Sequence, residues 1–217
     1  VCAESHETHG TIYKLIKKYG NAKQLKKYLL LKPEEQDEGV KKVYNQIKLP
    51  SEFIPFRDAS FGMKLTPGYK QAYNYIKSRN ITDLMVQMYN IGFCYRGIYE
   101  NRIIIPSYDC ERRINYFIAR SYLNRTKMKY KNPTVPKDEI IFNEGAVDWK
   151  NDVYLCEGVF DSVFLPNPIV LLGKKMSKLL FETLYNKAEG NIIICTDGDA
   201  FKDGIKLYHE LNGGRLY

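Results

Sequence analysis

Two short apolar runs that end in acidic residues decide the fold: residues 153–161 read VYLCEGVFD, and residues 192–199 read IIICTDGD. Each run has the length and composition of a buried strand. A third such run occupies 169–172, and helical patterns follow at 177–188 and 200–211. Because strands here alternate with helices, the sequence predicts an α/β fold over residues 151–217, with a parallel sheet flanked by helices.

The acids that follow these strands form a candidate metal site. Functional groups in a parallel sheet collect beyond the carboxyl ends of the strands, so Glu157, Asp197 and Asp199 are expected to converge. Asp161 lies one helical turn past Glu157. Several carboxylates in one cleft repel each other unless a cation joins them, and oxygen ligands favour Mg²⁺ or Mn²⁺. The alternative is that these acids only cap helices or occupy turns.

Residues 61–150 predict a smaller mixed α+β lobe. Thr66-Pro67 is a helix start, a second short helix is expected from Thr82, and strand-like runs occupy 91–95, 102–108 and 114–119. Turn-rich residues separate these runs, so we expect a small, mostly antiparallel sheet.

This smaller lobe concentrates positive charge. The chain carries 33 Lys and Arg against 25 Asp and Glu, a net charge of +8. Most of that excess lies between 102 and 132, where tyrosines interleave with the cations. Such a pattern suits phosphate contact and base stacking, although a solvated strand face with inward-packed aromatics would look the same.

The cysteine pattern and the hydropathy indicate which cellular compartment suits the chain. Five scattered Cys form no C-x-x-C pair, which favours a reducing compartment over a disulfide framework. No apolar run approaches the roughly 18 residues of a membrane span. We therefore expect a cytoplasmic protein with no membrane partner.

The strand–E-G-x-x-D, Gly173 and strand–D-G-D pattern resembles the Toprim domain, which primases, topoisomerases, some nucleases and recombination mediators share. The resemblance covers about 150–217. It implies that Glu157, Asp197 and Asp199 are catalytic and metal-linked, with Asp161 as a fourth metal ligand.

The segment upstream resembles the DnaG-type primase core in three motifs, in family order. These are the strand from Arg102 through Pro106 to Asp109, the strand that ends in Arg120, and the K-Y-x-N motif from Lys129 to Asn132. The resemblance implies a primase RNA-polymerase-core lobe in which Arg102, Arg120, Lys129 and Asn132 bind nucleotide phosphates or template backbone.

The N-terminal region resembles the end of a primase zinc ribbon and its following helix. We expect a helical remnant over 1–32 and a proline-containing acidic arm over 33–60, with Cys2 as a leftover zinc ligand. Zn²⁺ is expected only in a longer chain with a complete ribbon. Two departures from the family stand out: Ala200-Phe201-Lys202 follows D-G-D where small residues are usual, and the third acidic motif is not reached, so we expect a C-terminal truncation.

The expected function is therefore that of a DNA primase. It would synthesise short RNA primers from ribonucleoside triphosphates on single-stranded DNA, with Mg²⁺ or Mn²⁺, and would work with a replicative helicase. The small size favours a phage or mobile-element source. Three alternatives stay open: a Toprim nuclease, a non-catalytic single-strand-binding module and, least suited to 217 residues, a topoisomerase.

Overall fold

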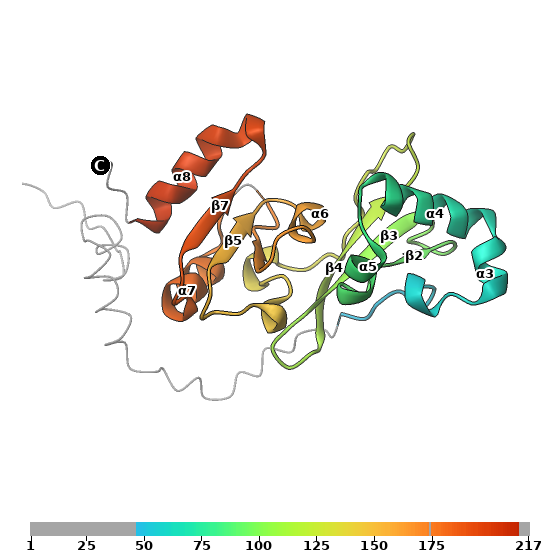
Figure 1. Ribbon diagram of the computed structural model, residues 1–217, viewed down its shortest axis with the longest axis horizontal. Helices are drawn as coiled ribbons and strands as arrows, with labels where there is room; N and C mark the ends of the chain where they lie inside the picture. Colours follow the sequence, from blue (N-terminus) through green and yellow to red (C-terminus); the bar gives the residue numbers. More distant parts are fainter. Residues whose placement is uncertain (1–46, 174, 213–217) are drawn as a thin grey trace, which may run out of the picture.

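The computed structural model describes residues 47–173 and 175–212, which form two β-sheets lying side by side (Figure 1). One sheet is antiparallel throughout, in the order β1-β2-β3-β4: β1 (Ile54–Pro55), β2 (Gly92–Cys94), β3 (Arg102–Tyr108) and β4 (Ile114–Ser121). The other is parallel, in the order β6-β5-β7: β5 (Val153–Cys156), β6 (Pro168–Val170) and β7 (Ile192–Cys195). We call these, with their helices, the antiparallel lobe and the parallel lobe.

Within the described residues, each lobe carries three α-helices. The antiparallel lobe has α3 (Phe61–Leu65), α4 (Pro67–Ser78) and α5 (Asp83–Met88); the parallel lobe has α6 (Val159–Ser162), α7 (Lys178–Lys187) and α8 (Phe201–Leu211). Short 3₁₀ turns add η1 (Phe56–Asp58), η2 (Lys137–Glu139), η3 (Glu144–Ala146) and η4 (Gly198–Ala200). Among the described residues, no helix is both long and apolar enough to cross a bilayer.

Side-chain caps explain where the helices begin. Four helices start just after a Ser or Thr whose hydroxyl accepts a hydrogen bond from a backbone N–H in the first turn: Ser60, Thr66, Thr82 and Ser177. Such caps satisfy donors that a helix leaves unpaired at its start. The predicted starts at Thr66-Pro67 and Thr82 are therefore confirmed.

The predicted fold class is confirmed: a parallel sheet flanked by helices, preceded by an antiparallel sheet. β5 and β7 have the expected bounds, whereas β6 ends at Val170 instead of Leu172. The reason is the backbone of Leu172, whose φ of 56° lies in the left-handed region that a strand cannot use.

The arm predicted over residues 33–60 ends earlier than expected. Ile54 and Pro55 pair with Phe93 and Gly92 of β2, and the ring of Phe56 stacks on Phe93 with centroids 5.2 Å apart. Phe56 is buried, so this stretch belongs to the antiparallel lobe. Pro55 suits this edge strand, which tolerates a missing N–H donor. The expectations for residues 1–46 and 213–217 fall outside the described residues.

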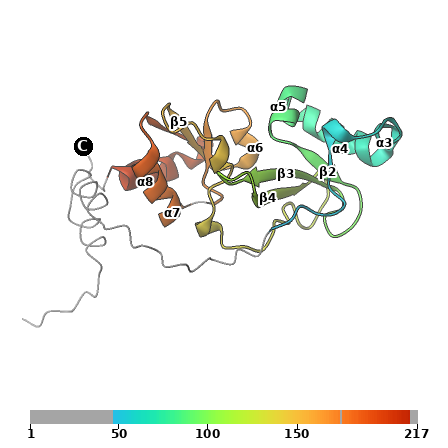
Figure 2. The same ribbon diagram turned by 90° about the horizontal axis from the view of Figure 1, so that it is seen from below.

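A single hydrophobic core joins the two lobes. It contains side chains of α4, β2, β3 and β4 together with Cys156, Val159, Phe160, Val163 and Val170 of the parallel lobe. Figures 1 and 2 both place α6 on the side of the parallel lobe that faces the antiparallel lobe, with α7 and α8 farther away. The residues just after β5 are therefore packed between the lobes.

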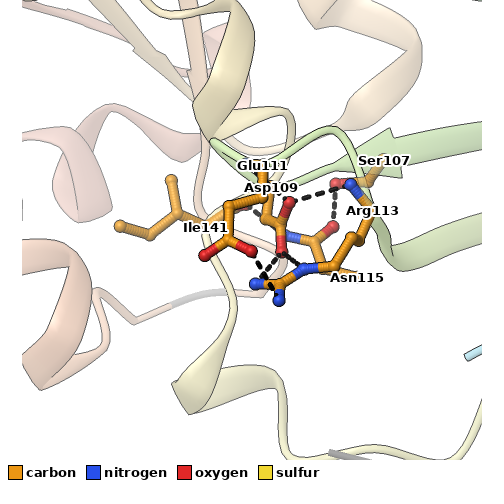
Figure 3. A network of polar contacts seen from close by, with 6 residues as sticks. All are labelled: Ser107, Asp109, Glu111, Arg113, Asn115 and Ile141. Carbon is orange, nitrogen blue, oxygen red and sulfur yellow. Dashed lines mark hydrogen bonds and ion pairs between the residues drawn. The ribbon is translucent and has the colours of Figure 1, made fainter. Parts of the chain in front are cut away.

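A polar network fixes the tip of the β3–β4 hairpin (Figure 3). The Asp109 carboxylate accepts backbone N–H bonds from Glu111 and Arg113 and side-chain bonds from the Arg113 guanidinium, all at 2.9 Å. Ser107 donates to Asn115 at 2.6 Å, and Asn115 donates to the Ile141 carbonyl at 3.1 Å. The hairpin tip is thereby tied to the segment that leads into the parallel lobe.

A matched pair of leucines tests the packing of the parallel lobe. Leu155 of β5 is fully buried, and Leu84 of α5 is 66% exposed. We expect Leu155→Ala to lower the free energy of unfolding by about 2–5 kcal/mol through the cavity it leaves. Leu84→Ala should change it by about 0.5 kcal/mol or less. Urea denaturation of both variants measures the difference, and equal effects would contradict the assigned β5 core position.

Candidate metal and nucleotide site

The register of β5 and β7 brings the acidic residues to one edge of the sheet. Cys156 and Cys195 are paired in the parallel ladder, and they end their strands. Glu157 follows one, and Thr196-Asp197 follows the other, so both acids lie at the same edge of the sheet. Glu157 is partly buried and Asp197 is exposed.

Asp161 completes this edge from α6. Burial raises the pKa of its carboxyl, and the neighbouring charge of Asp197 raises it further. The position that a Cβ on Gly158 would occupy is filled by an Asp161 carboxylate oxygen, so glycine is needed there for the acid to fold back over the turn. At Gly198, by contrast, a Cβ would meet nothing within 4 Å, so the glycine predicted to permit a tight turn has no such steric role.

These acids suit a hard divalent cation, although they do not form a closed set. Within residues 47–173 and 175–212, no three Asp, Glu, His or Cys side chains are arranged to hold a metal ion. The side chain of Asp199 lies outside the described part of the structure. Nonetheless, Asp161 and Asp197 lie close enough to repel each other, and an oxygen-only pair of this kind is stabilised by Mg²⁺ or Mn²⁺.

Phe160 places two arginines beside the acids. The guanidinium groups of Arg79 and Arg120, both from the antiparallel lobe, each lie 5.1 Å from the centroid of the Phe160 ring. The ring is buried, and Tyr75 of α4 meets it edge-on at 6.4 Å. Both arginines counteract the rise in the pKa of Asp161, so their charges act on this carboxylate. We call this meeting of Phe160, Arg79 and Arg120 the lobe junction.

Arg120 is held in place by a short strand-like segment. Tyr130 accepts a hydrogen bond from the Arg120 guanidinium, whose centre lies 5.0 Å from the Tyr130 ring centroid. Lys131 donates its N–H to Ala119, and Ser121 donates its N–H to Lys129, so residues 129–131 pair with the edge of β4. Arg120 is only 9% exposed, and its Nε has no hydrogen-bond partner among the described residues. Within the described part of the chain, this buried donor is therefore unsatisfied.

The other predicted binding residues take different positions. Arg102 is only 8% exposed, and it donates to the carbonyls of Met128 at 3.1 Å and Lys129 at 3.4 Å. This geometry supports the loop that carries Lys129 and differs from the open phosphate contact expected for Arg102. Asn132 likewise accepts the Ala119 N–H at 3.0 Å. Lys129 is exposed, as a phosphate ligand would be.

Arg79 is a site residue that the sequence did not reveal. It forms the C-cap of α4, and its Nε donates to the Tyr75 hydroxyl at 2.7 Å. The sequence analysis predicted phosphate-binding cations only in the basic segment at 102–132, and Arg79 lies outside it. The only local signal is a cation at a helix end before Asn80, whose φ is 59°, and this pattern is common at helix ends.

Comparison with known proteins gives this arrangement a context. No protein-family model matches the chain. A curated DNA primase from Mycoplasma genitalium is 28% identical over 116 residues, which cover 48% of this chain and 19% of that protein. The predicted resemblance to DNA primases is therefore confirmed at the level of sequence similarity.

Solved primase structures show the same fold. The Aquifex aeolicus primase (zinc-binding and RNA polymerase domains) aligns with a TM-score of 0.57 and 20% identity, over 67% of this chain and 48% of that one. A primase domain from Pseudomonas aeruginosa gives 0.56 and 18%, over 72% and 64%. A DnaG primase catalytic domain bound to single-stranded DNA gives 0.54 and 20%, over 67% and 62%. The chain has the fold of DnaG-type catalytic cores, and it spans less than two thirds of each relative's length.

The raised pKa of Asp161 makes a testable prediction about stability without metal. A carboxyl whose pKa is higher in the folded than in the unfolded state contributes stability at low pH that is lost as pH rises through the folded pKa. We therefore expect Asp161→Asn to raise the melting temperature of metal-free protein at about pH 7. Thermal unfolding in a chelator at several pH values measures this effect.

Asp148 is the matched control of opposite sign. Hydrogen bonds from the Asn151 side chain and the Lys150 N–H lower the pKa of this exposed carboxyl. Its stabilising effect is present above the unfolded pKa, so Asp148→Asn should lower the melting temperature at about pH 7. A lower melting temperature for Asp161→Asn as well would show that Asp161 is a structural acid.

Proposed function

We propose that this chain is the catalytic core of a DnaG-type DNA primase, which makes short RNA primers on single-stranded DNA from ribonucleoside triphosphates. The lobe junction supports this most directly: two cations of one lobe lie at Phe160 and act on Asp161 of the other lobe, which is itself a neighbour of Asp197. A site with a carboxylate wall and a cationic wall suits a triphosphate, which needs a metal on one side and neutralising donors on the other.

The carboxylate wall is the proposed metal site of a Toprim lobe spanning 151–217. Glu157, Asp161, Asp197 and Asp199 would hold Mg²⁺ or Mn²⁺. The ion, when bound, supplies charge stabilisation for the triphosphate and the leaving pyrophosphate. The mutual repulsion of Asp161 and Asp197 in the metal-free protein supports this assignment, because a cation relieves it.

The cationic wall is proposed to bind phosphate groups. Arg79 and Arg120 are oriented by Phe160 and by their tyrosine partners, so less side-chain freedom is lost when they bind an anion. Lys129 is exposed on the loop that Arg102 supports, and it would contact the template backbone. Tyr130 is 41% exposed beside it and offers a ring for base stacking.

The proposed reaction needs no nucleophile from the protein. The 3′-hydroxyl of the growing primer loses its proton to solvent, and its oxygen bonds to the α-phosphorus of the incoming nucleotide. The bond from that phosphorus to the oxygen that bridges the α- and β-phosphates breaks, and pyrophosphate leaves. Cys156 lies next to Glu157, but burial raises the pKa of its thiol to about 12, so it stays protonated at neutral pH. The side chains around the site would bind and orient the reacting nucleotides.

The similarity to solved primase structures supports a nucleic-acid partner for this chain. One structural relative is described as bound to single-stranded DNA, and we propose the same kind of template here. On the sequence resemblance we also propose a replicative helicase partner, a bacterial or host-cell cytoplasmic location, and a division into a basic lobe (61–150) and a Toprim lobe (151–217). The phage or mobile-element source is proposed on the small size of the chain.

Primer synthesis tests the proposal. We expect short RNA products on single-stranded DNA with Mg²⁺ or Mn²⁺, from this chain or from a version extended at both ends. Asp197→Ala should abolish them, and Arg79→Ala or Arg120→Ala should reduce the rate by on the order of 10²- to 10³-fold. Arg96→Ala is the matched control, since Arg96 is an exposed arginine over Tyr95 in the β2–β3 turn.

The alternatives give different products in the same assay. Metal-dependent cutting of the DNA without RNA synthesis would assign a Toprim nuclease. Single-strand binding that persists in a chelator, with no product from either version, would assign a non-catalytic module. In either case the primase proposal is wrong.

The salt dependence of DNA binding tests the role of Lys129. Each phosphate contact to single-stranded DNA contributes about −0.7 to the slope of log K against log salt. Lys129→Ala should make that slope shallower by about 0.7, whereas Lys187→Ala should not, because Lys187 pairs with Glu144 at 2.7 Å in the parallel lobe. Fluorescence anisotropy with a labelled oligonucleotide at several salt concentrations measures both slopes, and an unchanged slope for Lys129→Ala would remove it from the interface.

A further inference from the structure

A second pocket lies where the two lobes meet, lined by residues other than those of the proposed active site. Its volume is about 460 Å³, within the range of small-molecule sites. Its wall combines the end of α5, the tip of the β3–β4 hairpin, the 142–146 segment and the stretch from α6 to β6. None of Glu157, Asp161, Asp197, Arg79 and Arg120 lines it.

The charged side chains of this wall favour an anion. Arg57 and Arg112 are both exposed and line the pocket, with Asp109 as the one acid. The Asp109 carboxylate is fully engaged by Arg113 and the Glu111 N–H (Figure 3). These hydrogen bonds, opposing burial, keep the pKa of Asp109 low. Arg57 meets Asp58 only loosely, at 3.6 Å in solvent, so both guanidinium groups can bind a phosphate.

The rest of the wall suits a planar ring. Tyr89 and Tyr108 line the pocket and are held by hydrogen bonds, from Tyr89 to the Ser162 carbonyl at 3.2 Å and from the Asn90 amide to the Tyr108 hydroxyl at 3.0 Å. Met88 and Phe142 add apolar surface. Rings fixed in this way present a stacking surface with little loss of conformational freedom.

One acceptor in this wall lacks a partner. Asn90 Oδ1 is buried and has no hydrogen-bond partner among the described residues, while the amide nitrogen of the same side chain is bonded to Tyr108. A buried acceptor without a donor costs free energy, so such atoms generally pair with a protein group, an ordered water molecule or a bound ligand. An N–H group on a ring in the pocket would supply the donor after a small movement of the Asn90 side chain.

We propose that this pocket is a second nucleotide site, which binds a mononucleotide with its phosphate on Arg57 and Arg112 and its base against Tyr89 and Asn90. The wall comes from both lobes, so the bound nucleotide would also stabilise their contact. The site needs no metal and is independent of the proposed primase activity.

Calorimetric titration of the full chain with AMP and GMP, in EDTA, tests the proposal. The chelator removes the metal on which the carboxylate site depends, so binding there is suppressed. We expect saturable binding with one equivalent, about tenfold weaker in Arg57→Ala and in Arg112→Asn. Asparagine suits position 112, because Arg112 has a φ of 61°, which asparagine tolerates well.

Three controls make the result decisive. Arg96→Ala removes the same charge from the β2–β3 turn and should bind AMP like the parent chain. Asp197→Asn should also bind it unchanged. Ribose 5-phosphate should bind at least about tenfold more weakly than AMP if the base is recognised.

Several outcomes would overturn the second site. These are no AMP or GMP binding at millimolar concentration, equal weakening by Arg96→Ala, loss of binding in Asp197→Asn, or ribose 5-phosphate that binds as tightly as AMP. Primer synthesis by the same preparations is scored separately, so either proposal can fail while the other stands.

Discussion

The buried ring of Phe160 is the contact on which the site depends. It belongs to the parallel lobe, yet it is in contact with Arg79, Arg120 and Tyr75 of the antiparallel lobe. A cation over an aromatic ring gains about 0.5–1 kcal/mol when exposed and about 2 when desolvated. Asp161 is the next residue in the chain, so the ring that holds the cations also sets where this carboxylate stands.

The site is arranged at some cost to the metal-free fold. Asp161 and Asp197 repel each other, and Arg120 buries a guanidinium whose Nε is unpaired among the described residues. Groups of this kind are destabilising until a ligand of the right charge arrives. The core of apolar side chains that runs from α4 through β3 to α6 compensates, because it fixes the two lobes against each other. The apolar core that stabilises the fold and the charged groups of the proposed site therefore both lie where the two lobes meet.

The sequence predicted those features that depend on local patterns. Apolar runs defined β5 and β7, Thr66-Pro67 and Thr82 marked helix starts, and the acids after the strands were placed at one sheet edge because parallel strands share a direction. β1 was missed because proline-containing edge strands lack a clear alternation. Features that depend on contacts between distant segments were also missed: Arg79 lies 81 residues before Phe160 and joins it only through folding. The burial of Arg102 was missed for the same reason. It depends on contacts with the loop at 128–129, which the sequence of its own strand does not indicate.

The central claim is that a divalent cation binds at the carboxyl edge of the parallel sheet, beside the lobe junction. Anomalous diffraction from crystals of this chain soaked in Mn²⁺ tests it most directly. We expect a manganese peak within coordination distance of Asp197 and of at least one of Glu157, Asp161 and Asp199, and we expect it to be lost in Asp197→Ala crystals. A fully occupied peak elsewhere, or no peak at saturating Mn²⁺, would contradict it.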